Sequence, residues 1–369
     1  MDIKVITRHA PSNYGSLLQS IATQAIIEQL GHKCKIIDYI REDERGLHGV
    51  ITALQRKNSW NSNLLKKLSY IILRYPDEKI AEVKFDAMRH RYLNLTEHCS
   101  TLDDLSKLDA DFFMTGSDQV WGSILNGKYD EAYFLTFVND KPKIAFSASF
   151  GKTDFTQDIE KEYKQFLSKY SFITVREDAA LKLLKQWGIS CVGQILDPTL
   201  ILSEMYWSKL CKNVRTPKKF VLVYQIHNDD RLGNYAQHFS KRVGLPLLRI
   251  SPFLHQASRE GKLKLLPDVE EFLSYIKNCT YFITDSFHGT AFALNFKKDF
   301  LEILPNTSTA SRNMSILRLT KLENRIVTDF NDFSLADQKI NYGEVNSILQ
   351  EQRNISMEKI RYIFSSLSK

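Results

Sequence analysis

The sequence contains few of the residues that make flexible tethers. Only nine prolines and 15 glycines occur in 369 residues, and no stretch is rich in glycine and serine. Hydrophobic residues make up 43% and charged residues 25% of the chain, which is ordinary for a globular protein and argues against collagen-like, repetitive and disordered classes. The length is sufficient for two hydrophobic cores.

Long apolar segments are also absent from the sequence. None reaches the roughly 18 residues that span a bilayer. The opening residues, MDIKVITRHAP, predict a strand that enters a loop, and they have neither the apolar centre nor the cleavage site of a signal peptide. We therefore expect a cytoplasmic protein, and the inner face of the membrane is an alternative location that the sequence leaves open.

Metal-binding and nucleic-acid-binding patterns are missing as well. The five cysteines form no C-x-x-C pair, and neither they nor the Asp, Glu and His residues cluster at metal-ligand spacing, so we expect no metal and no cofactor. The 50 Lys and Arg residues exceed the 43 Asp and Glu residues and give a formal charge of +7, which favours an anionic substrate or a membrane surface. Nucleic acid is not favoured, because no basic run is interleaved with aromatics.

Strand and helix patterns alternate in the first part of the chain. A strand over residues 4–7, a loop at 11–15, a helix over 17–30 and a strand over 34–39 predict a βαβ unit with a right-handed crossover. Most later strands are also separated by helical patterns, which predicts a doubly wound parallel sheet. These further strands are expected at 112–115, 143–147, 173–176 and 192–196.

Residues 41–98 interrupt this alternation with a helical, charge-rich insertion. Its apolar residues share one helical face beside basic ones: Leu64, Leu65, Leu68, Ile71 and Ile72 lie near Lys66, Lys67 and Arg74. Such a face binds a membrane surface or a partner, or it packs onto the protein's own sheet. We favour the second alternative, because most apolar stripes belong to a core.

A second alternating series follows a polar, basic linker at 211–219. Strands are expected at 220–225, 246–250 and 281–284, with helices at 234–243 and 269–278 between them. The sequence therefore predicts an α/β protein with two Rossmann-like domains that face one another across a cleft, and ligands at the carboxyl ends of the strands. The expected domains are 1–212 on the acceptor side and 213–341 on the donor side. A last helix, 342–369, is a candidate to return to the first domain.

A candidate anion site follows the strand at 281–284. Asp285 or Ser286 can cap the next helix, and His288, Gly289 and Thr290 then occupy its first turn, where the positive end of the helix dipole attracts phosphate. Gly289 would let the backbone approach a ligand, and His288 could donate a proton near neutrality. The alternative is a capped helix with a histidine that binds a nearby carbonyl.

A candidate sugar site follows the strand at 112–115. Asp118 emerges at the carboxyl end of this strand, where a carboxylate can accept hydroxyl hydrogen bonds or act as a base. Trp121 offers an indole face on which the C–H side of a sugar can pack. Burial of Trp121 in the core is an equally good reading of the sequence.

Three arginines follow predicted strands and could grip carboxylate or phosphate with two parallel hydrogen bonds. Arg176 lies at a strand-to-helix corner, Arg312 in a polar loop after a strand that ends near residue 304, and Arg8 at the end of the first strand. Taken singly, each of these arginine side chains is expected to be exposed to solvent. Their local contexts favour Arg176 and Arg312 over Arg8 as the arginines that converge on the cleft.

Five motifs, in this order and at these separations, resemble the polysaccharide pyruvyl transferase family. They are NYGSLLQ at 13–19, TGSDQVW at 115–121, VRED at 175–178, LDPT at 196–199 and DSFHG at 285–289. The resemblance implies a two-domain fold similar to the glycosyltransferase-B enzymes. It also implies phosphoenolpyruvate as the donor, a sugar of a surface polysaccharide or of its lipid-linked precursor as the acceptor, and a pyruvate ketal as the product.

The resemblance also suggests roles for the candidate residues. Ser286 stands where family members often carry a basic residue, so we expect the donor's anionic groups to bind Arg176, Arg312 and the helix start at Ser286, Gly289 and Thr290. His288 would bind the phosphate and protonate the leaving group, and Asp118 would act as the base on the acceptor hydroxyl. The remaining acceptor-side candidates are Asn13, Tyr14, Gly15, Ser117 and Trp121.

Two rival functions remain open from the sequence. A glycosyltransferase that uses a nucleotide sugar would need the same two domains and the same helix start for its phosphates. A non-catalytic scaffold could instead hold polysaccharide machinery at the membrane through the basic helices of residues 41–98.

Overall fold

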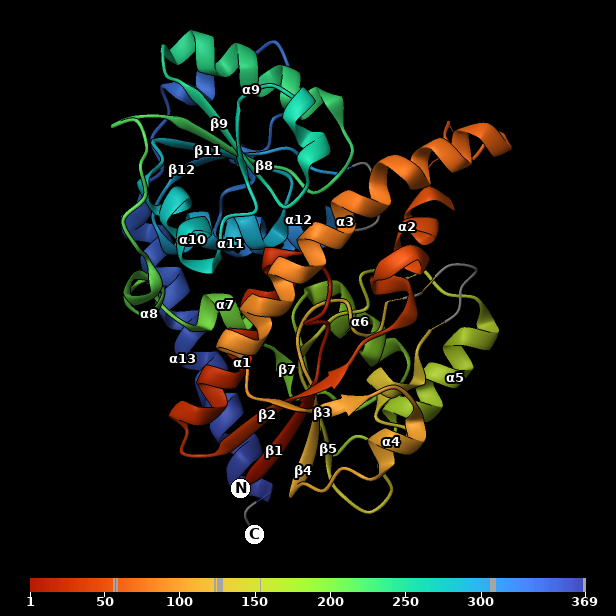
Figure 1. Cartoon of the computed structure of the whole chain (residues 1–369). Coiled ribbons are helices and arrows are strands. Elements are labelled where there is room, and N and C mark those ends of the chain that lie inside the picture. The colour runs from red at the N-terminus through yellow and green to blue at the C-terminus, as the bar shows by residue number, and fades with distance from the viewer. Residues whose placement is uncertain are drawn as a thin grey trace. The chain divides into compact units, whose positions relative to one another are not determined.

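The computed structural model describes residues 1–55, 57, 59–122, 124, 129–152, 154–305 and 310–367. The chain forms two compact units: the first contains Met1–Pro198 and Ile355–Lys369, and the second contains Thr199–Asn354 (Figure 1). The change of unit precedes the 212–213 boundary that the polar linker suggests. The reason is that Trp207, upstream of the linker, is fully buried in the second unit, where its indole donates to the Thr199 carbonyl at 2.9 Å.

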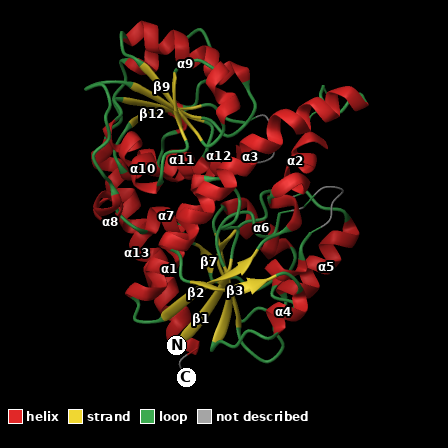
Figure 2. Ribbon diagram, in the orientation of Figure 1, coloured by secondary structure: helices red, strands yellow, loops and turns green. Residues whose placement is uncertain are grey.

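The first unit is built on a sheet of seven parallel strands in the order β3-β2-β1-β4-β5-β6-β7 (Figure 2). Every residue of β4 and β5 is buried, as expected for central parallel strands that are covered on both faces. β7 is shorter than the strand expected at 192–196, and β3 lies inside the insertion that we expected to be helical. The strands are β1 (Asp2–Ile6), β2 (Lys33–Tyr39), β3 (Leu95–Cys99), β4 (Phe112–Thr115), β5 (Lys143–Ala148), β6 (Phe172–Val175) and β7 (Gly193–Gln194).

Helices connect these strands and supply the rest of the core. Trp121, Phe134, Phe150 and Tyr163 form its aromatic centre. The helical segments are α1 (Tyr14–Gln29), η1 (Glu42–Glu44), α2 (Gly46–Gln55), α3 (Leu64–Tyr92), α4 (Leu102–Ser106), η3 (Glu131–Phe134), α5 (Gln157–Leu167) and α6 (Asp178–Gln186). The last helix, α13 (Tyr342–Leu367), starts in the second unit, and its residues from Ile355 onward belong to the first.

The second unit contains five parallel strands in the order β10-β9-β8-β11-β12. The strands are β8 (Val221–Tyr224), β9 (Leu247–Ser251), β10 (Lys262–Leu265), β11 (Tyr281–Thr284) and β12 (Asp299–Glu302). The helical segments are α7 (Pro198–Ile201), α8 (Glu204–Leu210), α9 (Asp230–Val243), η4 (Leu254–Ser258), α10 (Val269–Asn278), α11 (Phe287–Asn295), α12 (Ala310–Leu319), η5 (Glu323–Arg325) and η6 (Ser334–Ala336).

The two sheets share one topological feature that locates binding sites. The direction of winding reverses between β1 and β4 in the first unit and between β8 and β11 in the second. In doubly wound sheets, ligands bind at the carboxyl ends of the strands at this point. Asp118 lies in the loop that follows β4, and His288 lies in the first turn of the helix that follows β11, so both candidate groups lie at such an edge.

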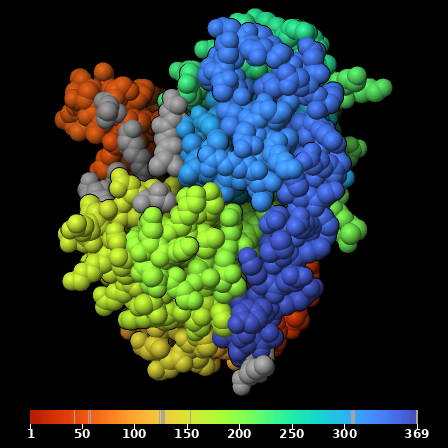
Figure 3. All heavy atoms as spheres, turned by 180° about the vertical axis from the view of Figure 1, so that it is seen from behind, coloured from red at the N-terminus to blue at the C-terminus, as the bar shows by residue number. Residues whose placement is uncertain are grey.

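The expectation that the apolar stripe of residues 64–72 packs onto the protein's own sheet is wrong. Leu64, Leu65 and Ile72 are 71%, 77% and 69% exposed. Of the five residues of the stripe only Ile71 is partly buried, and together with Tyr70 it packs on α2 side chains in a small cluster, not on the sheet. In Figure 3 the orange segment that includes α2 and the start of α3 is visible at the surface of the first unit.

Candidate active site

Asp118 is held in a constrained position after β4. Its backbone has φ 78°, a left-handed conformation that is uncommon for residues other than glycine. The Ser16 hydroxyl donates to Oδ2 of Asp118 at 3.0 Å, and the backbone N–H of Ser149 donates to the Asp118 carbonyl at 3.1 Å. The carboxylate is therefore oriented by the start of α1 and by the segment after β5.

Arg176, directly after β6, lies among carboxylates of its own unit. Its guanidinium nitrogens lie 2.9 Å from Asp197, 3.5 Å from Glu177 and 3.7 Å from Asp118. Burial lowers the pKa of Arg176, but the attraction of these carboxylates outweighs burial and raises the pKa above its usual value. The structure thus brings Arg176 and Asp118 together, although we assigned them to different substrates.

Asp197 is a member of this cluster to which the sequence analysis gave no role. Its Oδ2 accepts hydrogen bonds from Ser117 Oγ and from Arg176 Nη1, both at 2.9 Å. Asp197 belongs to the LDPT motif, and this motif was the signal that could have identified it. Its contacts indicate that the motif fixes the carboxyl edge of β4 to that of β6.

The acceptor-side candidates at the start of α1 are engaged within the protein. Asn13 is the N-cap, and its side chain accepts the Gly15 N–H at 2.8 Å. Tyr14 is fully buried, with its ring centre 5.0 Å from that of Phe85. These contacts account for the conformation at 13–15, and Ser16 provides the contact to Asp118.

Trp121 is part of the hydrophobic core. Its side chain has no exposed surface, and its indole N–H donates to the Tyr133 carbonyl at 3.2 Å. Phe134 and Phe150 pack against the rings. Of the two alternatives that the sequence leaves open, burial in the core is the one that this structure shows, and the indole has no face available to a sugar.

Arg8 and His9, at the carboxyl end of β1, have partners within the first unit. Arg8 Nε lies 2.6 Å from Glu44. Burial, followed by the charge of Arg89, lowers the pKa of His9 to about 3, so its imidazole is neutral at physiological pH. It accepts from Arg89 at 3.0 Å through Nδ1. Both residues therefore support the edge of the sheet.

In the second unit, the loop after β11 starts a helix as expected. Ser286 is the N-cap of α11, and its hydroxyl accepts the Gly289 N–H at 3.2 Å. His288 lies in the first turn and is 6% exposed. The positive end of the helix dipole together with an imidazole makes this turn suitable for an anion.

Gly289 and Thr290 serve the packing of α11. A Cβ atom at Gly289 would lie 2.5 Å from Oγ1 of Thr284, so glycine is required by the close approach of α11 to β11. We expected this glycine to make room for a ligand, but the space is occupied by Thr284. The Thr290 hydroxyl is buried and donates to Glu302, whose pKa burial raises to about 8.

Arg312 lies on a helix, which differs from the polar loop expected at this position. It falls in the first turn of α12, is 8% exposed, and precedes Asn313, which donates to Glu302. Glu302 also accepts from Thr290, two residues after His288. The segments that carry Arg312 and His288 therefore meet at one buried carboxyl group.

A histidine that the sequence analysis missed lies near this loop. His227 Nδ1 is 3.3 Å from Oδ2 of Asp285, and the same carboxylate accepts the backbone N–H groups of Ile226 and His227 at 2.8 and 2.9 Å. Asp285 thus connects the ends of β11 and β8, while Ser286 alone caps the helix. The position of His227, three residues after a buried strand, was the available signal.

A buried cation lies beside this connection on β9. Arg249 is fully buried and donates to the Gln225 side chain and to the Glu260 carbonyl, both at 2.9 Å. Burial, followed by the charge of Arg259, lowers the pKa of Arg249 to about 10. Its cost of burial is offset by these hydrogen bonds, so Arg249 gives the carboxyl edge of the second sheet a fixed positive charge.

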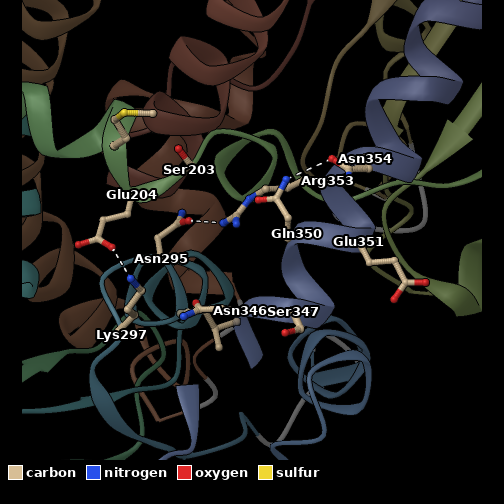
Figure 4. Close-up of a pocket in the computed structure, with 12 residues that line it drawn as sticks. Ser203, Glu204, Asn295, Lys297, Asn346, Ser347, Gln350, Glu351, Arg353 and Asn354 are labelled. Carbon is tan, nitrogen blue, oxygen red and sulfur yellow. Dashed lines mark hydrogen bonds and ion pairs between the residues drawn. The ribbon is translucent and has the colours of Figure 1, made fainter. Parts of the chain in front are cut away.

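A pocket of about 750 Å³ lies at the other end of α11 from His288, between α8 and α13 (Figure 4). Figure 4 shows Lys297 directed toward Glu204, at 2.9 Å, and Arg353 directed toward Asn295, also at 2.9 Å. No site residue predicted from the sequence lines this pocket. It is therefore separate from the candidate groups at the carboxyl edge.

Comparison with known proteins identifies the family. The family model of polysaccharide pyruvyl transferases matches residues 13–306, which is most of the chain. The chain belongs to the polysaccharide pyruvyl transferase family. This match confirms the resemblance seen in the five motifs, and it makes a transferase the enzyme class. No protein with a curated description matches this member of the family.

Solved structures show the fold of this pyruvyl transferase family member. The Staphylococcus aureus MnaA–UDP structure is similar with a TM-score of 0.52 and 13% identity, covering 100% of this chain and 98% of that one. Arabidopsis thaliana UGT89C1 complexed with UDP-L-rhamnose has a TM-score of 0.53 and 8% identity, with 99% and 98% coverage. Together with the two parallel sheets, these similarities confirm an α/β fold of two Rossmann-like domains like that of the glycosyltransferase-B enzymes.

In the part of the chain that the structure describes, no group of three or more His, Cys, Asp and Glu side chains is arranged to hold a metal ion. None of the helices formed by those residues has the combined length and apolar character that crossing a bilayer requires.

Proposed function

We propose that this protein transfers the pyruvyl group of phosphoenolpyruvate to a sugar of a surface polysaccharide, or of its lipid-linked precursor, and forms a pyruvate ketal. Family membership supports the reaction class. In this chain, the proposal rests on the arrangement of side chains around Asp118. A buried carboxylate with a constrained backbone, held by Ser16 and close to Arg176, is suited to remove a proton from a hydroxyl.

The reaction requires two hydroxyl groups on the sugar and yields inorganic phosphate. The methylene carbon of phosphoenolpyruvate gains a proton and becomes a methyl group, and the first hydroxyl oxygen bonds to C2. The C2–O bond to phosphate then breaks, and the second hydroxyl oxygen bonds to C2. Of the two protons that the hydroxyls lose, one balances the new methyl group and the other leaves with phosphate. General acid and base groups are needed, and a covalent enzyme intermediate is not.

In this proposal, the second unit binds the donor. The helix start at Ser286 and His288 receives the phosphate, where the imidazole can protonate the departing oxygen. Arg312 is the candidate for the donor's carboxylate or phosphate, because its segment meets that of His288 at Glu302. Support for this assignment comes from the chemistry of phosphoenolpyruvate, which carries two anionic groups and needs cationic and N–H donors.

The first unit supplies the base for the acceptor. Asp118 accepts the proton of the attacking hydroxyl, and Ser117 orients the loop through Asp197. Arg176 is also proposed to bind the donor, but its guanidinium is already shared by three carboxylates of its own unit. Its first role is therefore to hold Asp118 and Asp197, and a donor would have to share it with them.

A direct test follows the atoms of the reaction. The purified protein is incubated with phosphoenolpyruvate and a panel of candidate sugars, while phosphate release and the new ketal methyl group are followed by NMR. Phosphate release that requires an acceptor, together with the methyl signal, is the expected result. Stabilisation by nucleotide sugars but not by phosphoenolpyruvate in thermal unfolding, with glycosyl transfer, would instead establish the rival glycosyltransferase.

A further inference from the structure

Residues 64–83 of α3 carry an apolar surface that the described residues of the chain leave exposed. Its large hydrophobic residues are between 48% and 77% exposed. We call this surface the α3 arc, and it consists of Leu64, Leu65, Leu68, Ile72, Leu73, Ile80 and Val83. At about 100° per residue, these seven positions occupy one half of the helix circumference. Two charged residues of this stretch, Lys79 and Glu82, have positions within this half, and their side chains form an ion pair at 3.2 Å.

The other half of α3 explains why the helix is stable with this surface exposed. Tyr70 and Ile71 pack on Val50 and Leu54 of α2 and form a small cluster of their own. Asn63 caps the helix by accepting the Lys66 N–H at 2.9 Å. The arc is thus a fixed feature of a folded helix that is held from one side only (Figure 1).

The charges near the arc indicate the chemistry of its partner. Residues 64–76 contain three cations, Lys66, Lys67 and Arg74, and no acidic residue. Over residues 46–84, seven Lys and Arg residues face three Asp and Glu residues. On the same wheel Lys66 and Lys84 border the arc, whereas Lys67 and Arg74 lie on the opposite half and add to the positive charge of the segment. An apolar face on a basic segment complements a surface that combines an apolar interior with anionic groups, as anionic lipids do.

We propose that the α3 arc docks this protein onto the surface of an anionic membrane. The helix would lie in the plane of the interface, with the leucines of the arc among the acyl chains and Lys66 and Lys84, which border the arc, at the headgroup phosphates. Lys79 can extend its long chain toward the headgroups from within the arc.

This proposal is independent of pyruvyl transfer, because it concerns binding to lipid in the absence of a donor. The test is flotation of the full chain with vesicles of phosphatidylcholine alone and of phosphatidylcholine with about one third phosphatidylglycerol. We expect binding to the anionic vesicles only, and a loss of at least about tenfold in apparent affinity at ~1 M salt, which screens the lysines.

Two variants locate the contact. Leu65→Ser with Ile72→Ser removes apolar area from the arc, and Lys66→Glu with Lys84→Glu reverses the charge that borders it; each should weaken vesicle binding at least about tenfold. Matched controls are Met205→Ser, at an equally exposed apolar position of the second unit, and Lys218→Glu with Lys219→Glu, an exposed lysine pair elsewhere. Both controls should bind vesicles like the wild type, and all variants should keep its melting temperature.

Several outcomes would overturn the proposal. One is that the wild type floats with neither vesicle; another is that it floats equally with both at any salt concentration. A third is that the two control variants lose as much binding as the arc variants. A dimer that light scattering detects in the wild type, and that Leu65→Ser with Ile72→Ser dissociates, without any vesicle binding, would identify a second copy of the chain as the partner of the arc.

Discussion

Nη1 of Arg176 lies 2.9 Å from Oδ2 of Asp197, and both groups are almost completely buried. The same oxygen accepts the Ser117 hydroxyl. A buried guanidinium needs such partners, because leaving it uncompensated would cost several kcal/mol. Arg176, which the sequence suggests as a ligand of the donor, thus first serves to hold the side chains at the carboxyl edge of the first sheet together.

His288→Ala should lower the turnover of pyruvyl transfer by about two to four powers of ten, the usual contribution of a general acid. Phosphoenolpyruvate should also bind more weakly, because the phosphate loses the imidazole. Steady-state kinetics and calorimetry with phosphoenolpyruvate measure both effects. His238→Ala, at an exposed position of α9 in the same unit, is the control and should behave like the wild type. Near wild-type turnover in His288→Ala would remove the assignment.

Asp118→Asn should preserve the binding of phosphoenolpyruvate and lower turnover by about two to four powers of ten. Asparagine tolerates the left-handed backbone at this position and can still accept from Ser16, so the substitution removes the basicity of the side chain together with its negative charge beside Arg176. Asp140→Asn, at an exposed loop position of the same unit, is the matched control. Loss of donor binding in Asp118→Asn would show that the roles of the two units are reversed.

Trp121→Phe should destabilise the protein by about 2 kcal/mol and leave the KM for the acceptor unchanged. The substitution removes buried volume and leaves the Tyr133 carbonyl without the indole donor. Urea denaturation and acceptor kinetics measure the two quantities. If the KM rose while the stability stayed the same, the indole would be contacting the sugar and our placement of it in the core would be refuted.

Gly289→Ala should destabilise the protein by about 1–3 kcal/mol, because the new Cβ would meet Oγ1 of Thr284 at 2.5 Å. The comparison is Gly343→Ala in the first turn of α13, where the nearest atom belongs to a flexible Asn341 side chain at 3.2 Å. That variant should be neutral or slightly stabilising. Equal unfolding free energies of the two variants would contradict the close packing of α11 on β11.

Glu302 should make stability fall as the pH rises from 4.5 to about 8. In the unfolded chain its carboxyl loses the proton near pH 4.5, whereas burial raises its folded pKa to about 8, so the folded state binds more protons throughout this window. The contribution is at most about 5 kcal/mol. In Glu302→Gln, which keeps polar partners for Thr290 and Asn313, this pH dependence of the unfolding free energy should disappear. A pH profile identical to that of the wild type would show that Glu302 is ionised when folded.

Local patterns were sufficient for much of the fold. Buried parallel strands appear in sequence as short apolar runs, so β4, β8 and β11 were predictable almost to the residue. The N-cap Ser286 follows from hydroxyl chemistry next to a strand end. β3 and β10 were not predicted, because these edge strands have no continuous apolar run, and β12 was expected only through its end, near residue 304 instead of Glu302.

The sequence by itself therefore determined the α/β class, the family and the position of Asp118 and His288 at strand ends, since these depend on neighbours within a few residues. Only the tertiary structure decided what surrounds those groups. Ser117 and Asp197 meet across 80 residues of chain, Gly289 is explained by Thr284, and Trp121 is enclosed by Phe134 and Phe150. The exposure of the α3 arc was decided in the same way, because a helix stripe is apolar whether or not another part of the chain covers it.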